Sequence, residues 1–257
     1  MLKTLACFKW VIDDADIKVD AASRKLVLDR AGYKISAYDR NAIEEAVRLQ
    51  AAHGGTVAAL TVASPGAKAC LKDALSRGPD AAWFINDPAF ADLAPVQTAS
   101  LLAAAIRTGI EYDLIICGEG SGDLYTQQVG PLLAEILEIP CVTWVNKLSF
   151  SGGEIIAERK LEEGIETVAV KLPALVTILP DINTPRIPSL KQVLGAAKKP
   201  VHNLGIETLG PLCDPYLKTV EVLAATMDRK RIRFPADSEG IRAAVAALMK
   251  EGVIGGV

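Results

Sequence analysis

The chain has 257 residues, of which half are hydrophobic, and its formal net charge is −3. This length allows one large α/β domain with appended arms or two small domains, and the apolar content excludes a mainly disordered chain. The acidic balance argues against a nucleic-acid-binding protein, which usually carries a basic face.

Short apolar runs alternate with helical patterns over the first two-thirds of the chain. Strands are predicted at residues 2–12, 56–62, 81–85, 114–117 and 141–145. Helices are predicted at residues 39–53, 65–77, 95–108 and 126–137. Apolar strands separated by helices imply a parallel sheet covered on both faces, a three-layer α/β sandwich. Its ligand site is expected beyond the carboxyl ends of the strands, at residues 7–10, 62–66 and 118–128.

The pattern changes after residue 146. Short β-like segments with turn residues between them occupy residues 147–150, 154–159 and 167–172. The Ser-Gly-Gly sequence at 151–153 is expected to form a hairpin turn. A strand at 174–179, a proline-stiffened loop at 183–190 and a short helix to Ala197 follow. Beyond residue 200 we expect irregular chain until a helix at 238–251.

The sequence contains no apolar run as long as a membrane span, and its N-terminal residues lack the apolar core of a signal peptide. Its five cysteines are scattered, odd in number and free of Cys-x-x-Cys pairs. This pattern argues against a disulfide framework or a zinc site, so we expect no metal and a reducing, cytoplasmic environment. Cys117 and Cys141 lie in apolar runs, where we expect buried, inert thiols.

The strongest local feature is a glycine-rich loop between a predicted strand and a predicted helix, Gly118-Glu119-Gly120-Ser121-Gly122-Asp123. Glycines let a backbone approach a phosphate closely, and a helix start offers free N–H groups. Hydroxyl and amide donors follow within the next residues, to Gln128. The loop lacks the GxGxxG register and the Walker lysine. It therefore predicts either a phosphate site or an ordinary tight strand-to-helix turn.

Other polar residues give weaker signals. Asp39 is expected to cap the first helix, and a contact with a ribose or an adenine is compatible with that role. Glu44 and Glu45 are adjacent carboxylates, typical of an exposed helix face. The histidines, His53 and His202, have no neighbours at metal-ligand spacing, and no G-x-S-x-G motif is present. We therefore predict no catalytic residue, which favours a carrier or binding subunit over a hydrolase or transferase.

The loop at 183–190 also allows two interpretations. Its prolines, Pro185 and Pro188, lower the entropy lost when a loop is presented to a partner, and Leu190 then offers an apolar anchor. The alternative is an ordinary surface turn with a buried leucine.

One block of residues resembles a known family. Its members are Glu158-Arg159, Glu163-Gly164, Glu166-Thr167, Leu172-Pro173-Ala174, Thr177, Asn183, Pro185-Arg186, Leu190 and Ala197-Lys198-Lys199-Pro200. With residues 9–13 and 44–49, they make the chain similar to the electron-transfer flavoprotein β-subunit family along nearly its whole length. The loop at 118–125 and the Gln-Gln-Val-Gly sequence at 127–130 resemble the Fix-type branch, which is associated with anaerobic carnitine metabolism or nitrogen fixation.

The resemblance implies an adenine-nucleotide α-hydrolase-like, Rossmann-like fold and a heterodimer with an α subunit that holds FAD. This chain would be an electron carrier and not an enzyme on its own. It would bind AMP or, in electron-bifurcating members, a second FAD. The heterodimer would pass electrons between an acyl-CoA dehydrogenase-like partner and another redox protein such as a quinone oxidoreductase.

The resemblance also implies a division of the chain. Residues 1–200 would be the nucleotide-binding domain, with a β-rich extension at 146–180 and a partner-recognition loop and helix at 183–196. Residues 201–257 would be an arm contacting the α subunit.

The family's nucleotide contacts correspond to residues at three strand ends. They are Cys7, Ser36, Ala37, Tyr38, Asp39, Val62, Gly118, Glu119, Gly120, Ser121, Gly122, Asp123, Leu124, Tyr125, Thr126, Gln127, Gln128 and Val129. Its partner-binding residues correspond to Pro185, Arg186 and Leu190, with Leu190 as the anchor.

The chain departs from the family pattern at two places. Ser36 and Ala37 replace an Asn-Pro pair that is common in the family, which weakens the adenine contact there. Leu124 and Tyr125 stand where other members carry Asp-Asp or Gly-Asp, and a bulky Tyr125 either crowds a second flavin or stacks on one. The choice between AMP and FAD, and with it electron bifurcation, stays open.

Two rival functions remain. A free-standing nucleotide-binding protein of the universal-stress type shares the sheet and the loop but needs neither the 183–190 segment nor a long C-terminal arm. An ATP-using ligase of the same broad fold should carry a pyrophosphatase loop or a lysine-bearing motif, and neither is visible.

Overall fold

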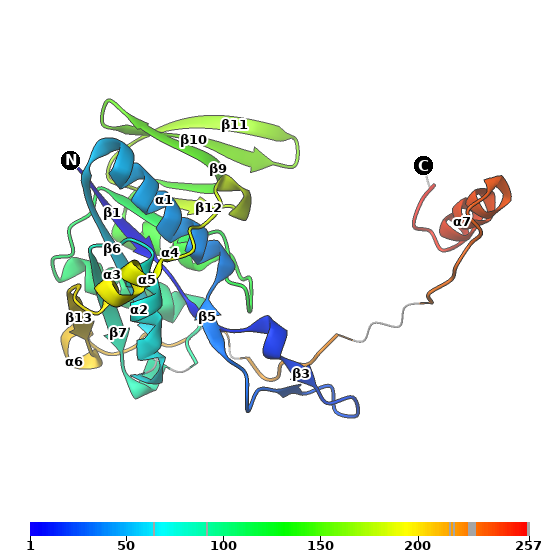
Figure 1. Cartoon of the computed structure of the whole chain (residues 1–257), viewed down its shortest axis with the longest axis horizontal. Coiled ribbons are helices and arrows are strands. Elements are labelled where there is room, and N and C mark those ends of the chain that lie inside the picture. The colour runs from blue at the N-terminus through cyan, green and yellow to red at the C-terminus, as the bar shows by residue number, and fades with distance from the viewer. Residues whose placement is uncertain (64, 91, 216, 218, 226–229, 256–257) are drawn as a thin grey trace.

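The computed structural model describes residues 1–63, 65–90, 92–215, 217, 219–225 and 230–255. One sheet of nine strands runs through the body, with helices on both faces (Figure 1). The strand order from edge to edge is β11-β10-β9-β12-β8-β1-β6-β7-β13. The strands are β1 Leu2–Cys7, β6 Gly55–Ala63, β7 Ala81–Asn86, β8 Leu114–Gly118, β9 Cys141–Ser151, β10 Glu154–Leu161, β11 Gly164–Lys171, β12 Ala174–Ile178 and β13 Val201–Leu204.

The strands from β9 across to β13 pair in parallel, and β9, β10 and β11 form an antiparallel extension at one edge. The predicted turn at 151–153 is confirmed. Ser151 pairs with Glu154, and Gly152 and Gly153 adopt positive φ values of 61° and 84°, a conformation that favours glycine.

Helices cover the two faces of the sheet and enclose two apolar cores. One face is covered by α1 Ala37–His53, α2 Ala69–Ser76 and α5 Leu190–Ala196. The other is covered by α3 Pro95–Arg107, α4 Val129–Leu137 and α6 Ile206–Leu209. In β1, Leu2 and Ala6 join the first core, while Leu5 and Cys7 join the second. Both faces of β1 are therefore buried, which explains its continuous apolar run and confirms the predicted three-layer sandwich.

Two predicted element bounds were wrong. The run at 2–12 divides, because β1 ends at Cys7 and β2 Trp10–Ile12 pairs with β5 Tyr33–Ile35 outside the main sheet. Helix α4 begins at Val129 and not at residue 126, because Tyr125 and Gln127 have positive φ values of 47° and 58°.

Two further expectations, on residues 201–209 and on Cys141, were wrong. Residues 201–209, expected to be irregular, contain β13 and α6, and β13 extends the sheet beside β7. Cys141, expected to be buried, is exposed, because it stands at the first position of β9 and Val142 faces the core instead. Cys117 is buried as predicted.

Several elements lie outside the sheet. A small hairpin joins β3 Lys18–Val19 and β4 Leu26–Val27. Figure 1 shows α7 Ser238–Lys250 away from the sheet, at the end of the C-terminal segment. Within the described ranges, no helix is long and apolar enough to cross a membrane. Short 3-10 turns occur at Asp14–Asp16, Pro65–Lys68, Pro88–Phe90 and Pro180–Ile182.

Candidate functional site

The predicted nucleotide site lies where the central strands end. Because β1 is paired in parallel with both β6 and β8, the carboxyl ends of these strands stand at the same edge of the sheet. Cys7, Val62 and Gly118 are at or near these ends. The loop at 118–128 follows β8 there, and it contacts Ser36, which lies between β5 and α1. The fold thus gathers the predicted residues from three parts of the sequence.

Asp39 connects two of the strand ends. Its Oδ2 accepts a hydrogen bond from the Lys9 backbone N–H at 2.8 Å, and its Oδ1 accepts one from the Gly118 backbone N–H at 3.2 Å. Burial raises the pKa of Asp39 to about 7, and the two N–H groups offset only part of this rise. The predicted role as a helix cap was wrong, because the N-cap position belongs to Ser36. A contact of Asp39 with a ribose or an adenine stays a prediction.

Two glycines of the loop are required by packing against the protein itself. A Cβ on Gly118 would lie 2.5 Å from Asp39 Oδ1 and 2.7 Å from Tyr38 Cβ. A Cβ on Gly120 would lie 2.3 Å from Cδ2 of Tyr125. Real Cβ atoms essentially never come this close to another heavy atom, so the glycines let α1 and the Tyr125 ring approach the loop.

Glu119 holds the loop onto the neighbouring strands. Its carboxylate is buried, accepting hydrogen bonds from the Trp144 backbone N–H at 2.9 Å and from the Thr177 hydroxyl. Gln127 Nε2 donates to its other oxygen at 3.4 Å. Burial raises the pKa of Glu119, and the bonds from Thr177 and Trp144 offset part of that rise. The Glu119 side chain therefore stabilises the fold of the loop from inside.

The outer side of the loop carries an ion pair and two aromatic rings. Lys9 Nζ lies 2.6 Å from Asp123 Oδ2, which connects the residues after β1 to the loop. The rings of Tyr38 and Tyr125 lie with their centroids 5.2 Å apart and tilted by 40°. Tyr125 and Leu124 are exposed beside them. An exposed aromatic side chain, Tyr125, therefore stands at this edge of the sheet.

Two helices begin at this edge without a side-chain cap. The Ser36 hydroxyl accepts a bond from the Gly122 N–H at 3.2 Å instead of capping α1. Gln128, the N-cap of α4, makes no side-chain cap bond either. Free N–H groups at a helix start, together with the helix dipole, favour an anion. Gly122 is exposed, and a Cβ on it would meet no atom within 4 Å, so the loop between β8 and α4 is open to solvent at this residue.

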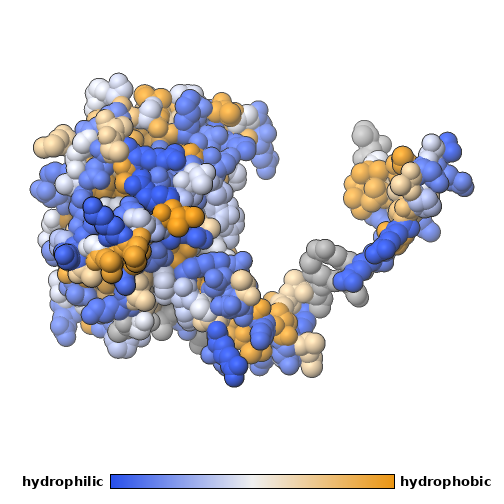
Figure 2. All heavy atoms as spheres, viewed as in Figure 1, coloured by the Kyte–Doolittle hydropathy of each residue, from blue (hydrophilic) through white to orange (hydrophobic). Residues whose placement is uncertain are grey.

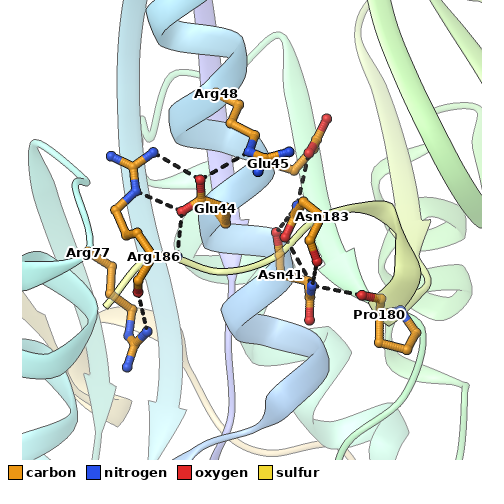
Figure 3. A network of polar contacts seen from close by, with 8 residues as sticks. All are labelled: Asn41, Glu44, Glu45, Arg48, Arg77, Pro180, Asn183 and Arg186. Carbon is orange, nitrogen blue, oxygen red and sulfur yellow. Dashed lines mark hydrogen bonds and ion pairs between the residues drawn. The ribbon is translucent and has the colours of Figure 1, made fainter. Parts of the chain in front are cut away.

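The predicted partner-binding residues Pro185 and Arg186 lie beside α1. Arg186 makes an ion pair with Glu44 of α1, with Nε 2.7 Å from Oε2 (Figure 3). Pro185 precedes it in irregular chain, and Leu190 begins α5 with an exposed side chain. Pro185 and Arg186 line one hollow together with Ala37, so the predicted partner-binding group adjoins the predicted nucleotide contacts at the start of α1.

The expectation that Glu44 and Glu45 lie on an exposed face was wrong, since both are buried. Glu44 meets Arg186 from a distant part of the sequence and Arg48 from its own helix. The available sequence signal was the spacing of Asn41, Glu44, Glu45 and Arg48, which places four polar residues on one side of a helix. A polar stripe on an otherwise apolar helix indicates a second polar segment packed against it.

The chain matches the model of the electron transfer flavoprotein domain over residues 25–208. The match covers more than half of the chain. The chain belongs to the electron transfer flavoprotein family. Members of this family carry electrons, generally involve a flavin and work with partner proteins. The matched range includes the whole loop at 118–129 and the segment at 183–190, while Cys7 and Lys9 precede it.

Proposed function

We propose that the chain is the β-type subunit of an electron-transfer flavoprotein and binds an adenine nucleotide at the carboxyl edge of its sheet. The observation that carries this proposal is the contact of the loop after β8 with the start of α1, where the N–H of the exposed Gly122 donates to the Ser36 hydroxyl at 3.2 Å. The first N–H groups of α1, and those of α4 directly after the loop, have no side-chain cap and would serve as donors to a phosphate group. The predicted loop residues 118–129 would hold the phosphates, and Ser36–Asp39 and Val62 the adenosine.

The nucleotide is AMP or a second FAD. The exposed Tyr125 ring, backed by the half-buried Tyr38, offers a surface on which a ring system would stack, whether it belongs to a bound nucleotide or to a flavin of the partner chain. The loop sequence favours the Fix-type branch of the family. A bound flavin would supply the one- or two-electron chemistry, and the residues of this chain would bind and orient it.

The exposed apolar surfaces support a partner chain, the FAD-bearing α subunit. Helix α7 carries apolar side chains at helical spacing, and they are exposed: Ile241, Val245, Leu248 and Met249. The β3–β4 hairpin adds exposed Val19 and Val27, and Figure 2 shows hydrophobic residues on both regions. Exposed apolar residues in a contiguous group mark a protein interface. We therefore assign these surfaces to the α subunit.

A third surface suits a redox partner such as an acyl-CoA dehydrogenase. Ile187 is 93% exposed and Leu190 is 76% exposed, and Leu194 lies one helical turn beyond Leu190 with an exposed side chain. The alternative of a buried leucine at residue 190 is excluded. Apolar side chains presented singly from a proline-stiffened segment are suited to insertion into a pocket of another protein.

The decisive experiment is co-expression with the flavoprotein α chain, followed by an absorption spectrum and analysis of nucleotides released by heating. The expected product is a yellow heterodimer that releases AMP with one flavin, or carries two flavins. A colourless monomer that binds and hydrolyses ATP would refute the carrier function and support the universal-stress type.

A matched pair of variants tests the position of the nucleotide. Gly122→Asp adds a carboxylate where a side chain has open space, and it should abolish retention of the nucleotide by repelling its phosphates. Gly122→Asn adds a side chain of the same shape without charge and should retain it. If both variants retain the nucleotide equally, the phosphates do not bind at this loop.

A further inference from the structure

The segment between the 3-10 turn Pro180–Ile182 and α5 has no regular secondary structure. It contains none of the ladder bonds that fix a strand, yet it presents the exposed Ile187 and leads into the exposed Leu190. Side chains of α1 hold it instead, as Figure 3 shows. The position of the exposed apolar residues therefore depends on a few polar contacts.

The main contact is made by the Glu44 carboxylate. It accepts two bonds from the Arg186 guanidinium, from Nε at 2.7 Å and from Nη2 at 3.1 Å, and a third from the Arg186 backbone N–H at 3.1 Å. Arg48 adds a bond from the same helix at 3.1 Å. Glu44 has a side chain only 6% exposed, so water cannot readily replace these partners. One carboxylate thus fixes both the backbone and the side chain of Arg186.

Asn183 fixes the start of the segment to the same helix. Its Nδ2 donates to the Asn41 carbonyl at 3.1 Å and to Glu45 Oε2 at 2.9 Å. In return, Asn41 Nδ2 donates to the Asn183 carbonyl at 2.8 Å. From the other side, Arg77 donates to the Arg186 carbonyl at 3.3 Å. The segment is therefore held at Asn183 and Arg186, while its apolar residues Ile187 and Leu190 are exposed.

The pKa of Glu44 agrees with a strong ionic contact. Burial would raise this pKa, but the Arg186 guanidinium and backbone N–H, with Arg48, more than offset the effect and lower it. Glu44 is therefore ionised at neutral pH, and the positive charge that pairs with it belongs to Arg186 of the segment.

A hollow of about 440 Å³ lies between α1 and the segment, lined by Arg40, Arg77 and Ile187 among others. Space is thus available into which the segment would move if the contact were lost.

We propose that Glu44 is a positioning residue for partner docking: its forked contact with Arg186 holds residues 183–190 so that Ile187 and Leu190 are presented to the redox partner. This inference rests on the docking surface of the proposed function. Glu44 does not touch the partner and acts through Arg186. A binding element that is held in its bound conformation loses less conformational entropy on association.

The test uses the purified heterodimer and the acyl-CoA dehydrogenase of the same organism as electron donor. Glu44→Gln keeps the shape of the side chain and removes the charge. If the segment then holds its docking position in about one molecule in ten, the dehydrogenase's KM for the heterodimer rises about tenfold while kcat is unchanged. Amide hydrogen exchange at Arg186 should quicken, because its N–H then lacks the Glu44 acceptor in most molecules, with bound flavin retained.

Three further variants separate the possible outcomes. Arg48→Gln removes the other cation of Glu44 without touching the segment and should leave KM unchanged. Leu190→Ala should raise KM by itself, and Glu44→Gln should add little to it, because the two residues act through one contact. If Glu44→Gln fails to fold, Arg186→Lys is the substitute, because it keeps the positive charge but cannot make the two parallel guanidinium bonds to Glu44. The same rise in KM is expected for it.

Two results overturn the proposal in different ways. If Leu190→Ala docks like the unaltered protein, the docking surface is wrong and the role of Glu44 falls with it. If Leu190→Ala docks weakly but Glu44→Gln docks normally, the docking surface stands and the positioning role is refuted.

Discussion

Gly118 is the residue at which the fit of the strand end can be tested most directly. In Gly118→Ala, the new Cβ meets Asp39 Oδ1 at 2.5 Å and the Tyr38 backbone carbon at 3.0 Å, so α1 must move away from β8. Overpacking of this kind destabilises a protein by about 1–3 kcal/mol. The hydrogen bond from the Gly118 N–H to Asp39 would also weaken, which adds about 1 kcal/mol. We expect a total loss of about 3 kcal/mol in the free energy of unfolding.

For a chain of this size, each kcal/mol lowers the melting temperature by roughly 2–4 °C, so the expected fall is roughly 6–12 °C. Scanning calorimetry of the purified protein measures it. Gly122→Ala is the matched control, because no atom lies within 4 Å of its new Cβ, and its effect should stay within about 0.5 kcal/mol. If the two variants melt at the same temperature, the close packing of α1 against Gly118 is wrong.

Two further predictions concern Asp39 and α7. Because the pKa of Asp39 rises from 3.8 to about 7 on folding, its contribution to stability is complete below about pH 4 and is lost as the pH rises through 7. A pKa difference of about three corresponds to about 4 kcal/mol in the free energy of unfolding. The melting temperature should therefore fall more steeply between pH 5 and 8 in the unaltered protein than in Asp39→Asn. Equal slopes for the two proteins would contradict the raised pKa of Asp39. Deletion of α7 should prevent co-purification with the α subunit while leaving the far-ultraviolet circular dichroism of the body intact, and a heterodimer that survives the deletion would exclude α7 from the interface.

The sheet was predictable because its strands are buried on both faces. An apolar run such as residues 114–117 stands out in the sequence whatever lies beside it, and the glycines at 152 and 153 indicate their turn locally. The strand β13 gives no such signal. It lies at the sheet edge and includes the exposed His202 and Asn203, and its place depends on pairing with Trp83 and Phe84 far away in the sequence. A local sequence pattern cannot indicate a pairing with a strand that is far away in the sequence.

The candidate site was predictable in its location but less so in its contacts. The carboxyl edge of a parallel sheet follows from topology, and it brought Cys7, Ser36 and the loop at 118–128 together. The glycine pattern suggested an approach to phosphate, yet Gly118 and Gly120 are required by contacts within the protein. Of the three loop glycines, Gly122 alone has open space at the position of a Cβ. Sequence spacing cannot distinguish a glycine that admits a ligand from one that admits a neighbouring side chain.

Two buried acids on α1 show why charge alone does not predict a role. Asp39 is bonded to two backbone N–H groups, which do not fully offset its burial, and its pKa is raised. Glu44 meets two guanidinium groups, and its pKa is lowered. Asp39 therefore joins two strand ends that are already fixed by the sheet, whereas Glu44 holds a segment that has no ladder of its own. Loss of Glu44 should consequently affect presentation of the segment more than the stability of the sheet, and this difference is what the docking and exchange measurements compare.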